Sequence, residues 1–586
     1  MRKEIAHLLL VPIVLLAWAR LGAPQLTLYS WDAVAKYQSP YLSAIAPGQE
    51  GDAVSRRVVV VVVDALRADA SRTLPAINRL REIGAERTAR AGQPSLSYPT
   101  WTTIGTGAWQ EQNGVTTNFY KRDILVDTIF EAAKRKGLTT AIVGAGSGWP
   151  QLYARGVDIN IGIEGPSDPY SDLQGVRRQD DQIEATALRV LAEKKPDLLL
   201  IHLAEPDNAG HARGAASREY ADAIATIDAR IGRLVAALDL RDTTILVTGD
   251  HGMLERGGHG GWEREVLTIP LVAAGAGIRP GRYAEAAQAD IAPTVAVLLG
   301  TSIPAHNQGR PLFDMLDLPE GLRARRAVDA AAQLRERYAQ YARVIGAAPF
   351  AHLQLEQARE ALAAGQTEKA YQAADADTEA TWKQAASVKA ARLTRERLAR
   401  LPIALLVMLL FAAYMAVVVR ARWDWRAPLA GTAVYTLIYQ GLYFGRGYKW
   451  SLSAFNTEEQ IMRFFTERTV DAMIALLLAA IVVGVLSRHR APLAVAVNAV
   501  TMSFMVAWWL AFQIGIFYVL YNTSFAWYLP DLTIGFKYYL DVLQTGAFWP
   551  LTPAPLLIVL PFAALGARWV AARVPAFCPL RRAFRT

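Results

Sequence analysis

The sequence predicts an α/β domain, built on a mostly parallel sheet flanked by helices, that is carried by a bundle of membrane-spanning helices. Short apolar runs alternate with helical patterns between residues 55 and 320, an order typical of a parallel sheet covered by helices. Longer apolar runs begin the chain and recur after residue 400, and most approach the ~20 residues needed to cross a bilayer. Of the 586 residues, 52% are hydrophobic and 20% are charged, which excludes a disordered protein.

Five short apolar runs predict the strands. The clearest is Val58–Val63, a row of valines typical of a strand buried on both faces. The other four runs are Thr140–Val143, Leu198–Leu203, Thr244–Val247 and Pro270–Ala273. Helical patterns lie between them, most clearly over Tyr220–Leu238, where apolar residues form one stripe.

Composition divides the chain into regions. We expect an N-terminal transmembrane anchor at 1–22, a linker at 23–54, the α/β domain at 55–320, a helical connector at 321–400 and a five-span bundle with a cytoplasmic tail at 401–586. The connector is rich in Ala, Arg, Gln and Glu, and Pro349 and Gly365 divide it into about three helices. The single cysteine, Cys578, excludes a disulfide framework and a cysteine metal cluster.

The first apolar stretch, Ile5–Trp18, fits either a signal peptide or an uncleaved anchor. Arg20 stands where a cleavage site needs small neutral residues, which favours the anchor. The remaining spans are expected at about 401–419, 428–444, 470–486, 491–521 and 553–572. The run at 491–521 is long enough to tilt or to end in an interfacial turn.

Arginine placement predicts the orientation. Arginines gather in the short loops at 420–426 and 487–490 and in the C-terminal tail, which the positive-inside rule assigns to the cytoplasm. Both termini are then cytoplasmic, and residues 21–400 lie outside. These arginines account for much of the net charge of +9, so no nucleic-acid binding is expected. Ala- and Arg-rich usage favours a bacterial inner membrane with a periplasmic domain over the endoplasmic reticulum.

Carboxylates and histidines follow the expected strands. Taken singly, an Asp after a strand is an ordinary turn or cap residue, and a loop His is an ordinary surface residue. Together they provide ligands for two metal ions, and mixed Asp/His ligation suits Zn²⁺, with Mn²⁺ as the alternative. The candidate ligands are Asp64, Asp207, His211, Asp250, His251 and His259.

A hydroxyl-rich segment, residues 94–107, is expected to supply a nucleophile. Metal coordination makes a hydroxyl ionise more readily, and a helix that begins after Pro99 would direct backbone N–H groups at a phosphate. Spacing leaves Ser95, Ser97 and Thr100 open as the nucleophile. Alternatively, all three hydroxyls cap turns and helices.

These motifs resemble the alkaline phosphatase superfamily, and within it the branch of type I phosphodiesterases/nucleotide pyrophosphatases and GPI ethanolamine phosphate transferases. The resemblance covers about residues 55–315 and rests on the segments 64–69, 94–107, 205–211, 250–253 and 258–260. It implies an alkaline-phosphatase-like catalytic domain with Ser97 as the nucleophile. It also implies one metal held by Asp207, His211 and His259, and a second held by Asp64, Asp250, His251 and Ser97 Oγ.

The chain departs from that family at two positions. Serine stands at Ser97 where threonine is common, and Thr100 stands where phosphodiesterase relatives often carry asparagine. Sulfatases share the fold, but they need an arginine two residues after the motif proline, where this chain has Trp101.

The resemblance implies attack of Ser97 on a phosphodiester and a phosphoryl-enzyme intermediate. Water as acceptor gives a phosphodiesterase, and a lipid or glycan hydroxyl gives a phosphotransferase. The order of anchor, catalytic domain, helical segment and bundle is similar to GPI ethanolamine phosphate transferases, although the five C-terminal spans are fewer.

Six spans and aromatic outer loops favour a phospholipid donor, specifically phosphoethanolamine transfer, over a soluble nucleotide-like phosphodiester. A transporter or scaffold with an inactive domain is a third class. The expected spans are nearly free of ionisable residues apart from Asp471, which disfavours transport.

Overall fold

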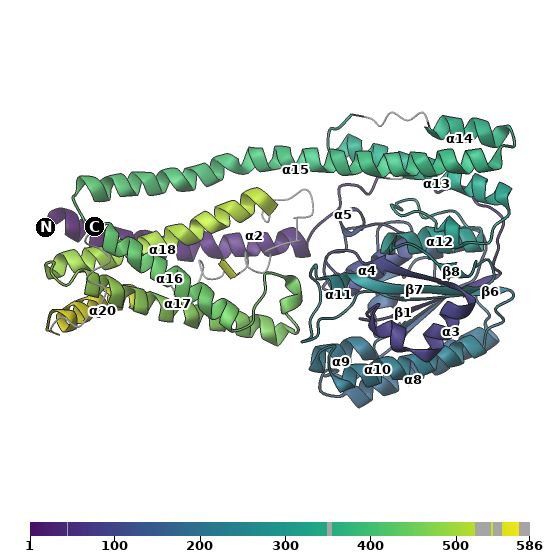
Figure 1. Ribbon diagram of the computed structural model, residues 1–586, viewed down its shortest axis with the longest axis horizontal. Helices are drawn as coiled ribbons and strands as arrows, with labels where there is room; N and C mark the ends of the chain where they lie inside the picture. Colours follow the sequence, from purple (N-terminus) through teal and green to yellow (C-terminus); the bar gives the residue numbers. More distant parts are fainter. Residues whose placement is uncertain (44, 349–353, 522–540, 543–553, 574–586) are drawn as a thin grey trace.

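The computed structural model describes residues 1–43, 45–348, 354–521, 541–542 and 554–573. It confirms the expected fold class, because an α/β domain with a mostly parallel sheet is joined by long helices to a helical bundle (Figure 1). All five expected strands are present. They are β1 (Arg57–Val63), β3 (Thr140–Ala145), β5 (Leu198–Leu203), β6 (Thr243–Gly249) and β7 (Thr268–Gly275).

The nine-stranded sheet runs in the order β4-β3-β5-β1-β6-β7-β2-β8, with β9 beside β2. Strands β4 through β6 along this path are parallel, and β7 is antiparallel to both β6 and β2. The strands that the sequence did not predict are β2 (Ala85–Arg90), β4 (Ile159–Ile163), β8 (Gly281–Arg282) and β9 (Ala286–Ala287). Strand β2 lacks an apolar run because Glu86 and Arg87 are buried in ion pairs, with Arg81 and Asp314 among their partners.

The valine strand β1 packs into two cores. Its alternate residues Val58, Val60 and Val62 face the side of α4 (Ser97–Thr106) and α12 (Ile291–Leu299). Val59, Val61 and Val63 face the side of α3 (Pro75–Ile83), α8 (Leu173–Glu193) and α10 (Arg218–Ala236). Burying a valine contributes about 1.5–3 kcal/mol, so this strand fixes the centre of the sheet.

Shorter helices complete the domain. They are α5 (Gln110–Asn113), α6 (Ile129–Arg135), α7 (Gly148–Leu152), α9 (Glu205–Arg213) and α11 (Arg264–Leu267), with 3-10 turns at Ala70–Thr73, Gln288–Asp290 and Phe313–Met315. Helix α4 begins at Ser97, before the start expected after Pro99, because proline is tolerated in the first turn of a helix.

The connector forms three helices, as expected: α13 (Glu320–Val344), α14 (Gln354–Ala363) and α15 (Thr367–Arg420). Gly365, with φ +71°, separates α14 from α15, and Pro349 lies outside the described residues. Helix α15 continues unbroken for 54 residues from the α/β domain into the bundle (Figure 1). The boundary expected at residue 400 therefore falls inside a helix about 80 Å long.

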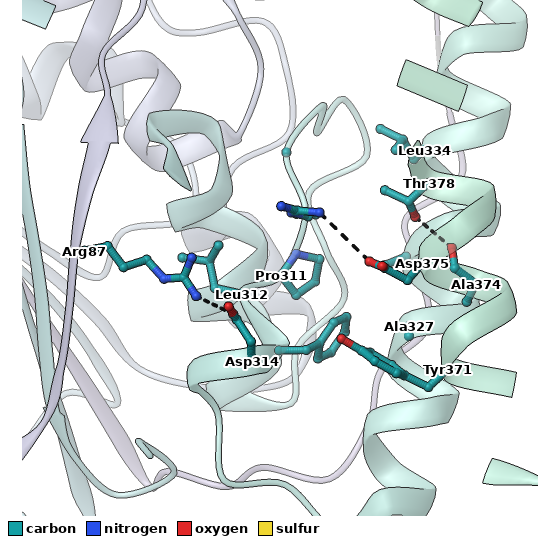
Figure 2. Close-up of a pocket in the computed structure, with 14 residues that line it drawn as sticks. Arg87, Pro311, Leu312, Asp314, Ala327, Leu334, Tyr371, Ala374, Asp375 and Thr378 are labelled. Carbon is teal, nitrogen blue, oxygen red and sulfur yellow. Dashed lines mark hydrogen bonds and ion pairs between the residues drawn. The ribbon is translucent and has the colours of Figure 1, made fainter. Parts of the chain in front are cut away.

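The connector is docked on the α/β domain by polar contacts. A cavity of about 220 Å³ lies between the 309–314 segment and helices α13 and α15. Figure 2 shows side chains that line it. Arg310 Nη1 lies 2.9 Å from Glu379 Oε1 and 3.9 Å from Asp375 Oδ1, both on α15. The start of α15 is thus fixed to the domain before the helix enters the bundle.

The bundle begins with a helix longer than expected. Helix α1 (Arg2–Ala17) continues through a π-helical turn (Trp18–Gly22) into α2 (Ala23–Ala35). The linker expected at 23–54 is therefore helical up to Ala35, because Arg20 is exposed and does not interrupt the helix.

Among the described residues, four helices are long and apolar enough to cross a membrane: Arg2–Ala35, Thr367–Arg420, Glu459–Leu486 and Pro492–Tyr521. The last two of these helices are α17 (Glu458–Leu486) and α18 (Pro492–Tyr521), and the bundle also contains α16 (Arg426–Gly445), a 3-10 turn (Leu452–Ala454) and α20 (Ala554–Arg573). Leu406 and Leu409 on α15 are exposed, as lipid-facing side chains are. The chain is an integral membrane protein.

The run expected at 491–521 forms one helix, α18. Most of the outer loop expected at 522–552, and the tail with Cys578, lie outside the described residues.

Candidate active site

The candidate ligands from the sequence meet at one edge of the sheet. Strands β5, β1 and β6 are parallel neighbours, so their carboxyl ends lie side by side, where α/β folds place ligands. Asp64 directly follows β1, and Asp250 and His251 follow β6. Helix α9, after β5, carries Asp207 and His211 one turn apart.

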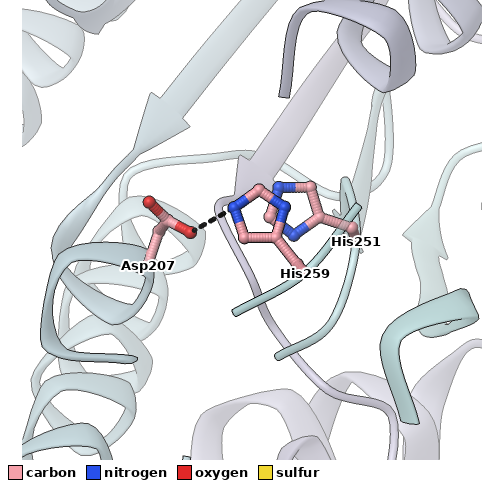
Figure 3. Close-up of side chains that lie close together, drawn as sticks. All are labelled: Asp207, His251 and His259. Atoms are coloured by element: carbon pink, nitrogen blue, oxygen red, sulfur yellow. Dashed lines mark ion pairs between the residues drawn. The ribbon is translucent and has the colours of Figure 1, made fainter. Parts of the chain in front are cut away.

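The first group contains Asp207, His211 and His259 (Figure 3 shows two of them with His251). Nε2 of His211 lies 3.1 Å from Nε2 of His259. Asp207 lies beside both rings, with Oδ2 at 3.5 Å from His211 Nε2 and Oδ1 at 3.6 Å from His259 Nε2.

The second group is centred on His251. Its Nε2 lies 3.4 Å from Asp64 Oδ1, 3.3 Å from Asp250 Oδ2 and 3.5 Å from Ser97 Oγ. The His251 ring also stacks on His259, with centroids 3.8 Å apart. Donor atoms within 4.8 Å of one another come from Asp64, Asp250 and His251, and from Asp207, His251 and His259, so His251 adjoins both groups.

The hydrogen bonds of the three histidines fix their tautomers. Nδ1 of His251 lies 3.0 Å from the Gly252 carbonyl oxygen, and Nδ1 of His259 lies 2.9 Å from the Ser95 carbonyl oxygen. A carbonyl oxygen only accepts, so each Nδ1 carries the proton and each Nε2 presents a lone pair. His211 Nδ1 lies 2.8 Å from the side-chain oxygen of Asn456, with the same consequence.

Three imidazole lone pairs therefore converge with carboxylate oxygens. Within the described residues, Oδ1 of Asp64 and Oδ1 of Asp207 are buried without a hydrogen-bond partner. Such an arrangement is repulsive unless a cation lies between the groups, and Asp/His donors of this kind suit Zn²⁺. The donor set therefore fits divalent cations.

The pKa shifts of the clustered residues are also consistent with a site for divalent cations. Burial and the nearby charges of Asp250 and Asp207 raise the pKa of the Asp64 carboxyl well above its usual value. Burial likewise raises the pKa of Asp250, and burial together with neighbouring histidines lowers the pKa of His259. A bound cation would favour the ionised carboxylates and the neutral imidazoles.

The structure distinguishes the three hydroxyls that spacing left open. Ser95 Oγ donates to the Gly261 carbonyl oxygen at 2.9 Å, and Thr100 Oγ1 donates to the Leu96 carbonyl oxygen at 2.8 Å. These two hydroxyls make turn and helix contacts. Only Ser97 Oγ, at the start of α4, contacts the cluster, through His251.

Several site residues escaped the sequence reasoning. His202, within the apolar run of β5, lies with Nε2 3.1 Å from Asp64 Oδ2, and burial lowers its pKa to about 3. The Trp101 indole donates to Asp250 Oδ2, and Asn118 Oδ1 accepts the Tyr98 N–H at 3.0 Å beside the start of α4. The available indication for His202 was that it is the single polar residue in the apolar run of β5, one position before the strand ends.

Two carboxylates of the sequence motifs lie outside the cluster. Glu205 is buried against Arg177 and Arg230, with Oε2 2.8 Å from Arg230 Nη1, and it holds the start of α9. Asp69 pairs with Arg67 at 2.6 Å.

Comparison with known proteins agrees with this site. The sequence model described as type I phosphodiesterase/nucleotide pyrophosphatase matches residues 58–260. Human GPI ethanolamine phosphate transferase 2, catalytic subunit, is 26% identical over 281 residues, which are 44% of this chain and 28% of the relative. GPI ethanolamine phosphate transferase 1 of Candida glabrata is 32% identical over 162 residues, which are 24% of this chain and 18% of the relative. The chain thus matches less than a third of these relatives' length.

Solved structures were also compared. Murine ectonucleotide pyrophosphatase/phosphodiesterase 5 aligns with TM-score 0.38 and 16% identity over 44% of this chain and 100% of its own. The relationship expected from the motifs is confirmed by the sequence comparisons. The match of residues 58–260 to the type I phosphodiesterase/nucleotide pyrophosphatase model agrees with the resemblance to the alkaline phosphatase superfamily that the motifs indicate. The curated relatives of this chain are GPI ethanolamine phosphate transferases.

Proposed function

We propose that this protein is a membrane-anchored, metal-dependent phosphotransferase that moves phosphoethanolamine from a phospholipid to a hydroxyl of a second lipid or a glycan. The observation that carries the proposal is the position of Ser97 Oγ, 3.5 Å from His251 Nε2 at the start of α4. The names of the relatives support the substrate class.

The residues of the two groups would hold two divalent cations, with Zn²⁺ as the expected metal and Mn²⁺ as the alternative. Asp207, His211 and His259 would hold one ion, and Asp64, Asp250, His251 and Ser97 Oγ the other. Bound there, the cations would neutralise phosphate charge and lower the pKa of the Ser97 hydroxyl.

Ser97 Oγ would then bond to phosphorus while the P–O bond to the diacylglycerol oxygen breaks; that oxygen keeps the electron pair and takes up the proton that Ser97 loses, which gives diacylglycerol. The acceptor oxygen next bonds to the same phosphorus while the P–O bond to Ser97 breaks, and the acceptor proton returns to the Ser97 oxygen. Ser97 is the first residue of α4, so a phosphate beside it would lie at the positive end of the helix dipole. Asn118 Oδ1 accepts the Tyr98 N–H, which leaves the amide Nδ2 as the group that would donate to a substrate oxygen.

The bundle supports a lipid substrate and the expected orientation. The N-terminus and the turn after Arg420 lie at the bundle end remote from the α/β domain (Figure 1). We therefore place the catalytic domain in the periplasm of a bacterial inner membrane, with cytoplasmic termini. Asp471 pairs with Arg446 and Arg468 at 2.8 Å, and Arg468 also pairs with Asp541 at 3.1 Å, so these charges of the bundle neutralise one another.

The test uses purified full-length protein in lipid nanodiscs that contain phosphatidylethanolamine labelled in its headgroup, with membrane lipids and glycans as acceptors. We expect label on a second lipid or glycan, and none with Ser97→Ala. Release of free phosphoethanolamine alone, or turnover of soluble nucleotide diesters alone, would contradict the transferase and indicate a nucleotide pyrophosphatase/phosphodiesterase.

A further inference from the structure

The membrane bundle contributes directly to the candidate active site. The segment 446–457, which joins α16 to α17 and is called here the bundle loop, lies against the α/β domain. Asn456 Nδ2 donates to the His211 carbonyl oxygen at 2.5 Å, and Asn456 Oδ1 lies 2.8 Å from His211 Nδ1. Both polar atoms of one side chain therefore bind the same histidine.

This pair of contacts fixes the orientation of the amide. A carbonyl oxygen only accepts, so the atom facing the His211 carbonyl must be the NH₂ group of Asn456. Oδ1 then has to accept the proton of His211 Nδ1. The His211 ring is thereby held in the tautomer that presents the Nε2 lone pair to Asp207 and His259.

The bundle loop also holds the segment that carries His259. Ser453 Oγ accepts the Gly261 N–H at 2.8 Å and donates to Glu263 Oε2 at 2.7 Å. Gly258 has φ +97°, and a Cβ there would lie 2.2 Å from the Ser453 carbonyl oxygen. The glycine therefore permits a close backbone approach that a side chain would prevent.

Asn456 is itself fixed to a membrane helix. It precedes Thr457, the N-cap of α17, and its backbone N–H donates to Gln460 Oε1 at 3.0 Å in the first turn of that helix. The position of His211 is thus set by two elements, α9 of the α/β domain and the start of α17 in the bundle.

We propose that Asn456 is a positioning residue for the cation bound by Asp207, His211 and His259, so that a membrane helix sets the geometry of the metal centre. The inference rests on the proposed function, because it requires a cation at that group. Groups that orient a metal-bound histidine typically change metal affinity 10–100-fold when removed, which is on the order of 1.4–2.7 kcal/mol.

The experiment measures Zn²⁺ stoichiometry and affinity by chelator competition on the full chain in detergent. Asn456→Ala removes both contacts, whereas Asn456→Asp keeps the acceptor for His211 Nδ1 and loses only the donor to the His211 carbonyl oxygen. Asn498→Ala is the matched control, because Asn498 bonds Ser487 at 2.9 Å within the bundle. We expect the wild type and the control to bind two Zn²⁺ ions tightly. In the Ala variant one ion should bind tightly and the other about 10–100-fold more weakly. In the Asp variant the Zn²⁺ affinity of the second ion should recover.

The outcomes of this Zn²⁺-binding experiment separate a failure of the proposed metal centre from a failure of the role of Asn456. A wild-type protein without bound Zn²⁺ would overturn both this inference and the proposed metal centre. Wild-type affinity in Asn456→Ala, or equal weakening in the Ala and Asp variants, would overturn the role of Asn456 and leave the proposed function standing.

The Asp variant decides the question if the Ala variant does not fold. A carboxylate acceptor makes the His211 imidazole a stronger donor to its metal, so the visible bands of the Co²⁺-loaded protein should shift from those of the wild type. Superimposable Co²⁺ spectra would overturn the proposal.

Discussion

The indole Nε1 of Trp101 donates a hydrogen bond to Asp250 Oδ2 at 2.9 Å. Trp101 lies one turn after Ser97 on α4, so the same helix presents the candidate nucleophile and the donor that orients a candidate metal ligand. Asp250 Oδ1 accepts the backbone N–H groups of Ala65 and His251. Three hydrogen bonds from protein groups therefore orient the Asp250 carboxylate.

Replacing Trp101 with Phe should weaken metal binding without unfolding the domain. The variant keeps an aromatic ring against Trp149 but loses the donor to Asp250, and we expect about tenfold weaker Zn²⁺ binding and a lower kcat. Trp149→Phe is the matched control, because the buried Trp149 Nε1 has no hydrogen-bond partner in the described part of the chain. Equal loss in the two variants would refute a role for the Trp101 N–H.

Replacing Ser97 with Ala should abolish turnover and leave Zn²⁺ stoichiometry unchanged. The loss follows from removal of the oxygen that attacks phosphorus, and phosphodiester turnover together with metal analysis checks both halves. Ser95→Ala is the control, because its hydroxyl bonds only the Gly261 carbonyl oxygen among the contacts described. A Ser97→Ala protein with wild-type rates would disprove the nucleophile assignment.

Removing the metals should lower both activity and thermal stability. Dialysis against a chelator leaves the buried carboxylates of Asp64 and Asp250 without a counter-charge. A ligand present at a hundred times its Kd stabilises the native state by about 2.7 kcal/mol, so Tm should fall by several degrees and recover with Zn²⁺ or Mn²⁺. In Asp64→Asn the chelator should lower Tm by less, because one of the buried negative charges is absent. An unchanged wild-type Tm would argue against structural binding of cations here.

Replacing Asn118 with Ala should impair phosphodiester turnover while metal content stays constant. Asn118 contacts the start of α4 rather than either histidine group, so its loss removes a donor to substrate oxygens and not a metal contact. We expect about a 10–100-fold fall in kcat/KM, equal to the loss of roughly 1.4–2.7 kcal/mol of transition-state binding. A fall in Zn²⁺ content instead would place Asn118 with the metal centre.

Replacing Glu205 with Gln should destabilise the fold while leaving metal content in the folded protein unchanged. Glu205 is almost fully buried and pairs with Arg177 and the buried Arg230. Its neutralisation breaks both ion pairs, although Arg230 keeps Asp181, and costs about 3 kcal/mol in unfolding free energy. Denaturant unfolding measures the cost, and Asp239→Asn, at an exposed pair with Arg241, should change stability far less. Loss of Zn²⁺ from folded Glu205→Gln would indicate a direct role in metal binding.

Much of the fold follows from the sequence because burial is a local pattern. The valines of β1 predict a strand buried on both faces. Because β1 and β6 are parallel neighbours, Asp64 and Asp250 lie at the same edge of the sheet. Strand β2 could not be found in this way, because Glu86 and Arg87 are buried through ion pairs that include the distant residues Arg282 and Asp314. The helix across residue 400 was also missed, since a change from polar to apolar composition does not break a helix.

The sequence by itself determined the α/β domain, the presence of membrane-spanning helices and the six metal-ligand candidates, because apolar runs and the polar residues that follow them are local features of the sequence. The spans expected at 428–444 and 553–572 are not among the four helices of the described residues that are long and apolar enough to cross a membrane. Only the tertiary structure decided that Ser97, and not Ser95 or Thr100, faces His251. It also decided that Asn456, 245 positions from His211, binds that ring. Such contacts join residues that are far apart in the sequence. They depend on how separate helices and strands pack, which a local sequence pattern does not predict.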